Sequence, residues 1–245
     1  MIQALAMAVG AATTGACIGS YASTAAIRGE RLQSSVAGRS HCDGCGRKLG
    51  FIQTFPLVSF LALRGQCSAC GSQIDVLHPC GEIAGAIVAG IAFATLGWPR
   101  GAGVAALGLV LLASSLVDVR TKRLPDLLTL FAAAICACLM LASGRDATWM
   151  GLAAASVSLL GLEATRRIFA HARGRQGLGF GDVKLLAALA LWLGAATPWA
   201  LIAACIAALL SFAIIRPKDG RLAFGPFIAG AGWTIGLARE AHWWR

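Results

Sequence analysis

Charged residues are scarce in this sequence. Asp, Glu, Lys and Arg together make up 13% of its 245 residues, against about 25% in typical soluble domains. Only 11 of the residues are acidic. This shortage excludes an ordinary soluble domain. It also means that an acid inside an apolar stretch needs a partner or a chemical role.

Apolar residues take the place of the missing charges. They make up 58% of the chain, and the mean hydropathy is +0.73. We therefore expect an all-α polytopic membrane protein with about eight transmembrane helices. The apolar segments, each near the roughly 20 residues that cross a bilayer, are 2–27, 80–98, 101–119, 125–143, 147–165, 183–197, 198–215 and 222–239. The boundary at Thr197-Pro198 is the least defined, and a re-entrant pair is an alternative there. The first segment has no basic start, which favours a retained helix over a cleaved signal peptide.

The 21 Lys and Arg residues are unevenly distributed between the loops, and the net charge is +10. With the N-terminus outside, 17 of them fall in cytoplasmic loops and 4 outside. Basic loops stay on the cytoplasmic side, so this count predicts the orientation. The same distribution explains the positive net charge, because basic loops fix the topology and can contact anionic lipid head groups. No nucleic-acid partner is expected. The chain then divides into a first transmembrane helix (1–27), a cytoplasmic segment (28–79) and a membrane core (80–245).

Four of the nine cysteines form two C-x-x-C motifs in the cytoplasmic segment, each followed by glycine. These are Cys42, Cys45, Cys67 and Cys70. Four thiolates are a frequent structural zinc site, and the cytoplasm disfavours disulfides. So small a segment can hardly build its own core, so bound zinc would supply folding energy. Bare thiols, a redox pair, or a ligand from His41 or His78 are the alternatives.

Two aspartates stand where membrane helices are expected to end or begin. Asp118 lies in the last turn of the third segment, which is the wrong end of a helix for a negative charge. Asp182 opens the sixth segment after alternating glycines, which allow a tight turn and a close approach of another chain segment. The predicted topology puts both acids at the cytoplasmic face. The element around Asp182 comprises Gly177, Gly179, Gly181 and Lys184.

Two carboxylates held close together cannot both ionise easily. Such a pair can activate a water as general base and protonate a leaving amine as general acid. This points to peptide hydrolysis at the membrane–cytosol boundary. Two other interpretations stay open. In the first, Asp118 forms an ion pair with Arg120, Lys122 or Arg123. In the second, the alternating glycines bind phosphate, although a glycine motif that does not follow a strand is weak evidence for phosphate binding.

Three further acids are candidates for substrate binding. Glu82 lies at the start of the second segment, Glu163 near the end of the fifth, and Asp126 follows Pro125 at the start of the fourth. An acid after proline also suits the first turn of a helix, so Asp126 is equally explained as a helix-end residue. Solvation at a helix end or a charge at a helix N-terminus is the corresponding alternative for Glu82 and Glu163.

At these motifs the sequence resembles the type IV prepilin leader peptidases, bacterial membrane aspartic peptidases with a Gly-x-Gly-Asp signature. The stretch 179–186 is similar to the second catalytic motif of that family, and Asp118 with 124–129 is similar to the first. The two cysteine motifs, with Phe55-Pro56-Leu57-Val58-Ser59 between them, resemble its zinc segment. Phe224-Gly225-Pro226-Phe227 resembles the start of its last helix.

The resemblance implies cleavage of prepilins, or of type II secretion pseudopilins, after a glycine at the cytoplasmic face of the bacterial inner membrane. It makes Asp118 and Asp182 the catalytic pair and the four cysteines zinc ligands. Many members also N-methylate the new amino terminus with S-adenosylmethionine. The sequence departs from the family in the part tied to that activity. Residues 19–23 read Gly-Ser-Tyr-Ala-Ser in place of Gly-Ser-Phe-Leu-Asn, and 78–82 read His-Pro-Cys-Gly-Glu in place of aromatic-Pro-Leu-Val-Glu. The sequence therefore leaves open whether this protein transfers a methyl group.

Two other classes of protein fit some of these features. An ion-coupled transporter would use Asp118 and Asp182 as a proton relay, but no clear internal repeat is present. A zinc-bearing membrane assembly factor without chemistry would tolerate replacement of both aspartates. Cleavage of a prepilin by the purified protein separates both classes from a peptidase.

Overall fold

The computed structural model describes residues 2–29, 40–174, 177–216 and 222–242. Within these ranges the chain is helical, and no strand is formed beyond two isolated bridges. The predicted all-α class is therefore confirmed. Arg175, Arg245 and most of the predicted basic loop 216–221 lie outside the described residues.

Eight of the described helices have 14 or more residues, and three short helical turns lie between them. In chain order the elements are α1 (Ile2–Arg28), η2 (Phe51–Thr54), α3 (Val58–Ala62), α4 (Leu77–Leu96), α5 (Arg100–Thr121), α6 (Asp126–Leu141), α7 (Arg145–Arg173), α8 (Phe180–Leu193), η3 (Gly194–Ala196), α9 (Thr197–Ile215) and α10 (Gly225–Glu240).

Five stretches of the described chain are long and apolar enough to cross a membrane. These are Gln3–Arg28, Leu77–Leu96, Arg100–Thr121, Arg145–Arg173 and the continuous run Phe180–Ile215. The last run contains α8 and α9, which are joined by η3, and α6 is a shorter apolar helix. The protein is thus a multi-pass membrane protein, while the count of eight spans stays a prediction.

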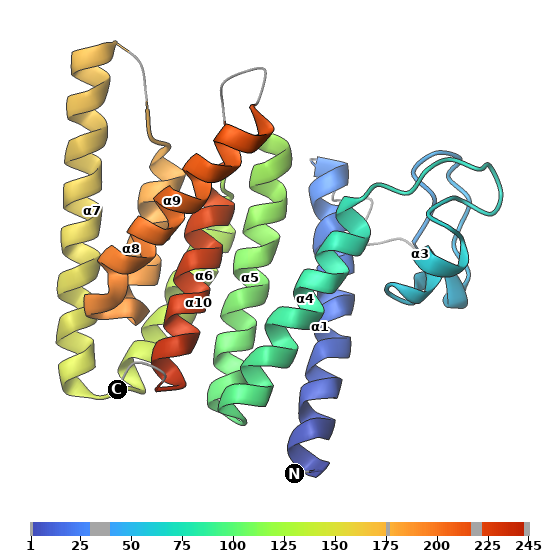
Figure 1. The fold of residues 1–245 in the computed structure, drawn as a ribbon, viewed down its shortest axis with the longest axis horizontal. Helices are drawn as coiled ribbons and strands as arrows, with labels where there is room; N and C mark the ends of the chain where they lie inside the picture. Colours follow the sequence, from blue (N-terminus) through green and yellow to red (C-terminus); the bar gives the residue numbers. More distant parts are fainter. Residues whose placement is uncertain (1, 30–39, 175–176, 217–221, 243–245) are drawn as a thin grey trace.

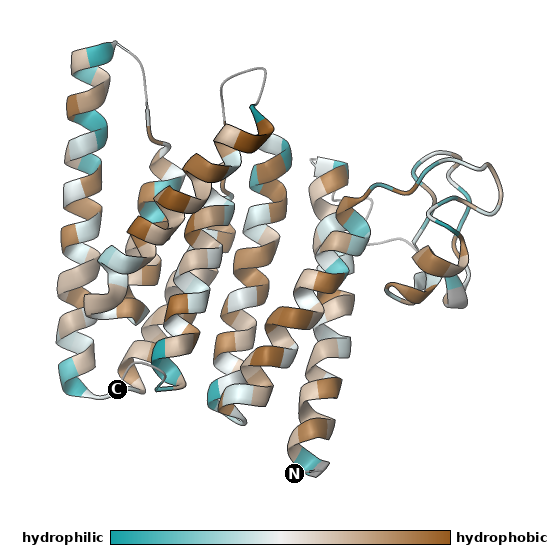
Figure 2. Cartoon of the chain, in the orientation of Figure 1, coloured by the Kyte–Doolittle hydropathy of each residue, from teal (hydrophilic) through white to brown (hydrophobic). Residues whose placement is uncertain are grey.

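Successive long helices alternate in direction (Figure 1). The cysteine-bearing segment and the turns before α6 and α8 lie at one end of the bundle, and both described termini lie at the other. Hydrophilic residues gather at the helix ends and in the cysteine-bearing segment, while the helix middles are hydrophobic (Figure 2). This is the distribution that a bilayer requires, because polar groups in hydrocarbon are costly.

The bundle is built around α8. Its buried residues lie on all sides of the helix, from Val183 to Leu193, as expected for a helix enclosed by others. By contrast, α7 buries only Gly151 among its described residues and forms the edge of the bundle in Figure 1. The two helices also differ in length. The 14 residues of α8 span about 21 Å, whereas the 29 residues of α7 span about 44 Å.

The α1–α4 pair packs at backbone contact through glycines. A Cβ atom added at Gly15 would lie 2.2 Å from the carbonyl oxygen of Gly85, and one added at Gly19 would lie 2.0 Å from that of Gly81. Small residues at four-residue spacing allow membrane helices to approach this closely. The pair carries the cysteine-bearing segment between its helices, so its packing positions that segment.

The opposite end of the bundle is held by Glu240. Arg100 donates two hydrogen bonds of 2.8 Å to its carboxylate, and Trp192 donates a third of 2.9 Å. The three residues come from α10, α5 and α8. The cluster therefore joins the end of α10 to the far ends of α5 and α8, the two helices whose other ends carry Asp118 and Asp182.

Candidate active site and metal centre

The two C-x-x-C motifs fold into matching loops. In the first, the Cys42 amide donates to the Arg47 carbonyl and the Gly46 amide donates to the Cys42 carbonyl, both at 2.9 Å. In the second, Cys67 and Gly71 make the same two bonds, again at 2.9 Å. Each loop also directs a backbone N–H at its first cysteine sulfur, 3.4 Å away. These N–H groups stabilise negative charge on sulfur.

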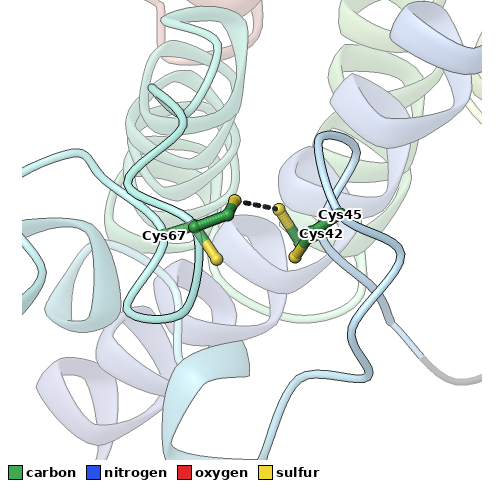
Figure 3. A group of neighbouring side chains, drawn as sticks. Cys42, Cys45 and Cys67 are labelled. Atoms are coloured by element: carbon green, nitrogen blue, oxygen red, sulfur yellow. Dashed lines mark hydrogen bonds between the residues drawn. The ribbon is translucent and has the colours of Figure 1, made fainter.

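The four thiols converge on one point. All four Sγ atoms lie within 4.8 Å of one another, and Figure 3 shows the side chains of Cys42, Cys45 and Cys67 pointing toward one another. The Sγ atoms of Cys42 and Cys70 are 3.9 Å apart. Tetrahedral coordination with Zn–S bonds of about 2.3 Å places sulfurs about 3.8 Å apart, so the arrangement fits zinc. Among the described residues the cluster contains cysteines alone, and neither His41 nor His78 belongs to it.

The electrostatics of the thiols also suit a metal, which binds thiolate rather than thiol. A hydrogen bond with the Ser72 hydroxyl lowers the pKa of the Cys42 thiol to about 6. The same hydroxyl lowers the pKa of the Cys70 thiol. Cys42 and Cys70 therefore lose their protons more readily than a free thiol. At Cys45 the hydrogen bond with the Arg47 backbone lowers the pKa, but hydrogen bonds with Cys70 and Cys42 outweigh it and raise the pKa of this thiol to about 11.

Glu82 attaches the cysteine-bearing segment to the helices. Its carboxylate is 7% exposed and accepts hydrogen bonds from the Ser20 hydroxyl at 2.6 Å and from the Leu57 amide at 2.7 Å. These donors belong to α1 and to the turn before α3, so Glu82 joins three parts of the chain. Its predicted role as a substrate ligand is untested, and this carboxylate already has two partners.

Further ion pairs connect the same parts. Arg28 at the end of α1 donates to Asp43 at 3.0 Å, and Arg120 at the end of α5 pairs with Asp75. The Leu77 amide and then Arg120 hold the pKa of Asp75 below its usual value, so Asp75 is charged at neutral pH. The segment is therefore held against α1, α4 and α5 by side chains that sequence periodicity does not reveal.

Asp118 lies buried in the last turn of α5, with 5% of its surface exposed. Its Oδ2 accepts a hydrogen bond of 3.1 Å from the amide of Gly225, the first residue of α10. The first amides of a helix have no partner within it and carry partial positive charge, so α10 stabilises this carboxylate. A Cβ at Gly225 would lie 2.7 Å from the same oxygen, so the contact requires glycine.

Asp182 lies in the first turn of α8 and is half-buried. A Cβ added at Gly179 would lie 3.0 Å from its Oδ2, and one added at Gly181 would lie 3.0 Å from Leu124 of the turn before α6. A Cβ at Gly225, the residue that contacts Asp118, would also lie 3.0 Å from Leu124. The structure thus brings the two acids, 64 residues apart in sequence (182 minus 118), to the same end of the bundle, on either side of the turn that contains Leu124.

The remaining predicted residues of this end form ion pairs around the aspartates. Lys184 pairs with Asp126, and its ammonium lies 5.0 Å from the centre of the Phe180 ring. Glu163 accepts hydrogen bonds from Arg166 at 2.7 Å and from Arg167 at 2.6 Å. Gly177 packs beside Phe169 of α7. Asp126 and Glu163 therefore have basic partners within the chain. The partner of Asp126 is distant in sequence, whereas those of Glu163 follow it by three and four residues.

Sequence reasoning missed the Gly225 amide as the partner of Asp118. The available signal was the Gly225-Pro226 pair that opens α10, because proline near a helix start leaves the preceding amide free to face another group. It also missed the hydroxyl of Ser20 and the amide of Leu57, whose partner Glu82 is distant in sequence from both.

These features define a class of protein: a polytopic membrane protein with two aspartates at one end of its helices and a cluster of four cysteines that could hold a metal ion. Comparisons with known proteins narrow the class. Residues 13–96 match the model of the bacterial peptidase A24 N-terminal domain, and residues 105–214 match that of the type IV leader peptidase family.

Several proteins named prepilin leader peptidase/N-methyltransferase are similar to the chain. That of Burkholderia pseudomallei (strain 1026b) is 37% identical over 203 residues, which are 79% of this chain and 65% of the relative. That of Stutzerimonas stutzeri is 34% identical, over 80% of this chain and 70% of the relative. That of Neisseria gonorrhoeae is 31% identical, over 83% and 72%. No solved structure matches the chain.

The chain belongs to the type IV leader peptidase family. It spans 65% of the length of the Burkholderia relative. The predicted family is confirmed, while the roles of individual site residues stay predictions.

Proposed function

We propose that this protein is a membrane aspartic endopeptidase that removes the leader peptide of type IV prepilins or type II secretion pseudopilins. The observation that carries the proposal is the placement of Asp118 and Asp182 at the same end of the bundle, around the turn that contains Leu124, in a chain of the leader peptidase family. The family resemblance supplies the cleavage position, after a glycine that precedes the substrate's hydrophobic helix.

The two carboxyl groups divide the chemistry of hydrolysis. One is ionised and takes a proton from water as the water oxygen attacks the scissile carbonyl, while the other is protonated and donates to the developing oxyanion. When the C–N bond breaks, a proton passes to the leaving amine, giving a carboxylic acid and a free amino terminus. The Gly225 N–H holds Asp118 in place through this cycle. The pair acts as a unit, so neither acid is assigned a fixed role.

The orientation follows from the charge count. With 17 of 21 basic residues in loops on one side, that side faces the cytoplasm of a bacterial inner membrane. The aspartates and the cysteine centre then lie at the cytoplasmic face, within reach of a leader peptide that has not crossed the membrane. Zinc held by Cys42, Cys45, Cys67 and Cys70 is structural in this proposal.

N-methylation of the new amino terminus is a second candidate activity. The names of the relatives include it. The methyl donor is S-adenosylmethionine, and the acceptor is the amine that cleavage releases.

The proposal is tested by incubating the purified protein with a prepilin in detergent and sequencing the product's amino terminus. Asp118→Asn and Asp182→Asn proteins are expected to lose at least about 10³-fold in cleavage rate, since each removes one half of the acid–base pair. Asp146→Asn is the matched control, because Asp146 is exposed in the first turn of α7.

Two outcomes contradict the proposal. Correctly processed product from either aspartate variant at the wild-type rate would remove the dyad. Proton-coupled uptake in vesicles by a protein that cleaves no prepilin would replace the peptidase with a transporter.

A further inference from the structure

A groove with a volume of about 540 Å³ lies between α7 and the start of α9. Its wall on α7 includes Met150, Ala154, Val157 and Gly161, whose spacing of three and four residues follows one face of the helix. The 11 steps from the first to the last of these (161 minus 150) correspond to about 16 Å of helix. Val157 is 72% exposed, so the groove is open on the outside of the bundle.

The two helices that border the groove come together at one end of it. There η3 packs against α7 and leads directly into α9, and Gly194, Ala195 and Pro198 close the groove. From this point α9 runs obliquely away from α7 and packs against α10 (Figure 1). The two helices therefore diverge toward the end of the bundle that carries the aspartates.

The open end of the groove lies one helical turn from Asp182. Leu186 lines the groove and follows Asp182 by four residues, so the two side chains lie on the same face of α8. The neighbouring helix gives the same depth. The Arg166 guanidinium of α7 lies 5.4 Å from the centre of the Phe180 ring, and the groove residue Leu162 comes one turn before Arg166. The groove thus continues from the candidate active site into the membrane.

The lining suits an apolar helix. Its described residues are apolar except Ser158 and Thr197, and the Thr197 hydroxyl is already bonded within its own turn. Ser158 differs from Ser156 of the same helix. The Ser156 hydroxyl donates to the Leu152 carbonyl at 2.8 Å, whereas the Ser158 hydroxyl has no hydrogen bond within the described part of the chain. Small residues four apart, here Ala154 and Ser158, together with an available hydroxyl favour close packing of another membrane helix.

We propose that this groove receives the hydrophobic helix of the substrate, an inference that rests on the peptidase function proposed above. Cleavage takes place just before that helix begins, so the helix has to descend into the membrane from the position of Asp182. The groove begins there and is closed at η3. The 12 steps from Asp182 to Gly194 (194 minus 182) span about 18 Å, so the groove holds about the first 12 residues of the substrate helix. A helix also offers backbone carbonyls to the Ser158 hydroxyl, which an acyl chain does not.

Photocrosslinking tests this contact directly. A benzophenone side chain placed at position 158 of the protein in lipid vesicles is expected to attach to added prepilin. Fragment mass spectrometry should locate the new bond within about the first 12 residues after the cut. The same group at position 156 is the matched control, because Ser156 is exposed on α7 and does not line the groove. It is expected to attach to lipid alone.

Filling the groove tests its use in catalysis. Ser158→Trp is expected to raise the KM for prepilin at least about tenfold with little change in kcat, because it removes binding that is the same before and during the reaction. Gly161→Phe should act alike, and a Cβ at Gly161 would meet nothing within 4 Å, so this change spares the internal packing of the bundle. Ser156→Trp should keep the wild-type KM. A Tm equal to that of the wild type verifies that each variant is folded.

Two results would overturn the inference and leave the peptidase intact. One is an unchanged KM in both filled variants while the wild type cleaves prepilin, which would place the substrate helix elsewhere. The other is attachment of the group at position 158 to lipid alone while prepilin is cleaved, which would assign the groove to lipid. Failure of the proposed function is a different result, in which the wild-type protein cleaves no prepilin, and it removes this inference as well.

Discussion

At the scale of single residues, the position of Asp118 depends on a glycine from another helix. A Cβ on Gly225 would lie 2.7 Å from the carboxylate oxygen and 3.0 Å from Leu124. Gly225→Ala is therefore expected to displace the carboxylate and to lower kcat/KM for prepilin cleavage by at least about tenfold.

The same helix provides the control for this prediction. A Cβ at Gly230 would meet nothing within 4 Å, so Gly230→Ala is expected to cleave at the wild-type rate. Full activity in Gly225→Ala, measured with the same prepilin, would show that the amide contact does not position Asp118.

The sequence predicted which acids stand out but not what they touch. Asp118 and Asp182 could be singled out because an acid at an apolar helix end is costly. The predicted alternation in direction of the transmembrane segments also placed both acids at the same face of the membrane. The partners of Glu82 and Asp126 could not be predicted, since contacts between helices depend on rotation and tilt that hydrophobic periodicity leaves undefined. The partners of Glu163 differ, because Arg166 and Arg167 follow it by three and four residues in the same helix, a spacing that brings side chains together.

At the scale of elements, the α1–α4 pair depends on close backbone contact. Gly19→Ala places a methyl group 2.0 Å from the carbonyl oxygen of Gly81, and backbone cannot move aside as a flexible side chain does. The expected destabilisation is about 1–3 kcal/mol, measured as a lower Tm in detergent. Gly10→Ala, where a Cβ would meet nothing within 4 Å, should leave the Tm unchanged. An equal Tm for the two variants would contradict close packing at Gly19.

The cysteine-bearing segment is expected to need its metal to stay folded. Elemental analysis should find about one zinc per chain, and Cys67→Ser should lower it. Cys80→Ser, which changes an exposed thiol outside the cluster, should not. Arg47 and Arg64 are exposed but lie in folded backbone. Chelation is expected to unfold that backbone and to make trypsin cleave after them, because metal binding supplies much of the folding energy of such segments. Unchanged digestion after complete removal of zinc would show that the segment folds without it.

The helices themselves were largely predictable, and their ends were less so. The expected segment 101–119 corresponds to α5 and 198–215 to α9. The expected boundary at Thr197-Pro198 falls where α9 begins, but the turn η3 before it was not foreseen. Apolar composition continues without a break through Gly194–Ala196, so hydropathy alone reports one run where the chain reverses.

At the scale of the whole molecule, the orientation in the membrane can be measured directly. Alkaline phosphatase folds only outside the cytoplasm, so a fusion after Ser143, between α6 and α7, is expected to be active. A fusion after Arg173, at the end of α7, is expected to be inactive, because that end carries the basic residues that stay inside. The reverse pattern would place the aspartates on the outer face.

The shortness of α8 bears on how water reaches the aspartates. A helix of about 21 Å is roughly 9 Å shorter than a hydrocarbon layer is thick, and Asp182 lies in its first turn. Because other helices enclose α8, protein and not lipid surrounds the space beyond its ends. Water is then expected to reach Asp182 through the protein, from the turns before α6 and α8, and not through a thinned bilayer. In vesicles of graded lipid chain length, turnover should therefore change little.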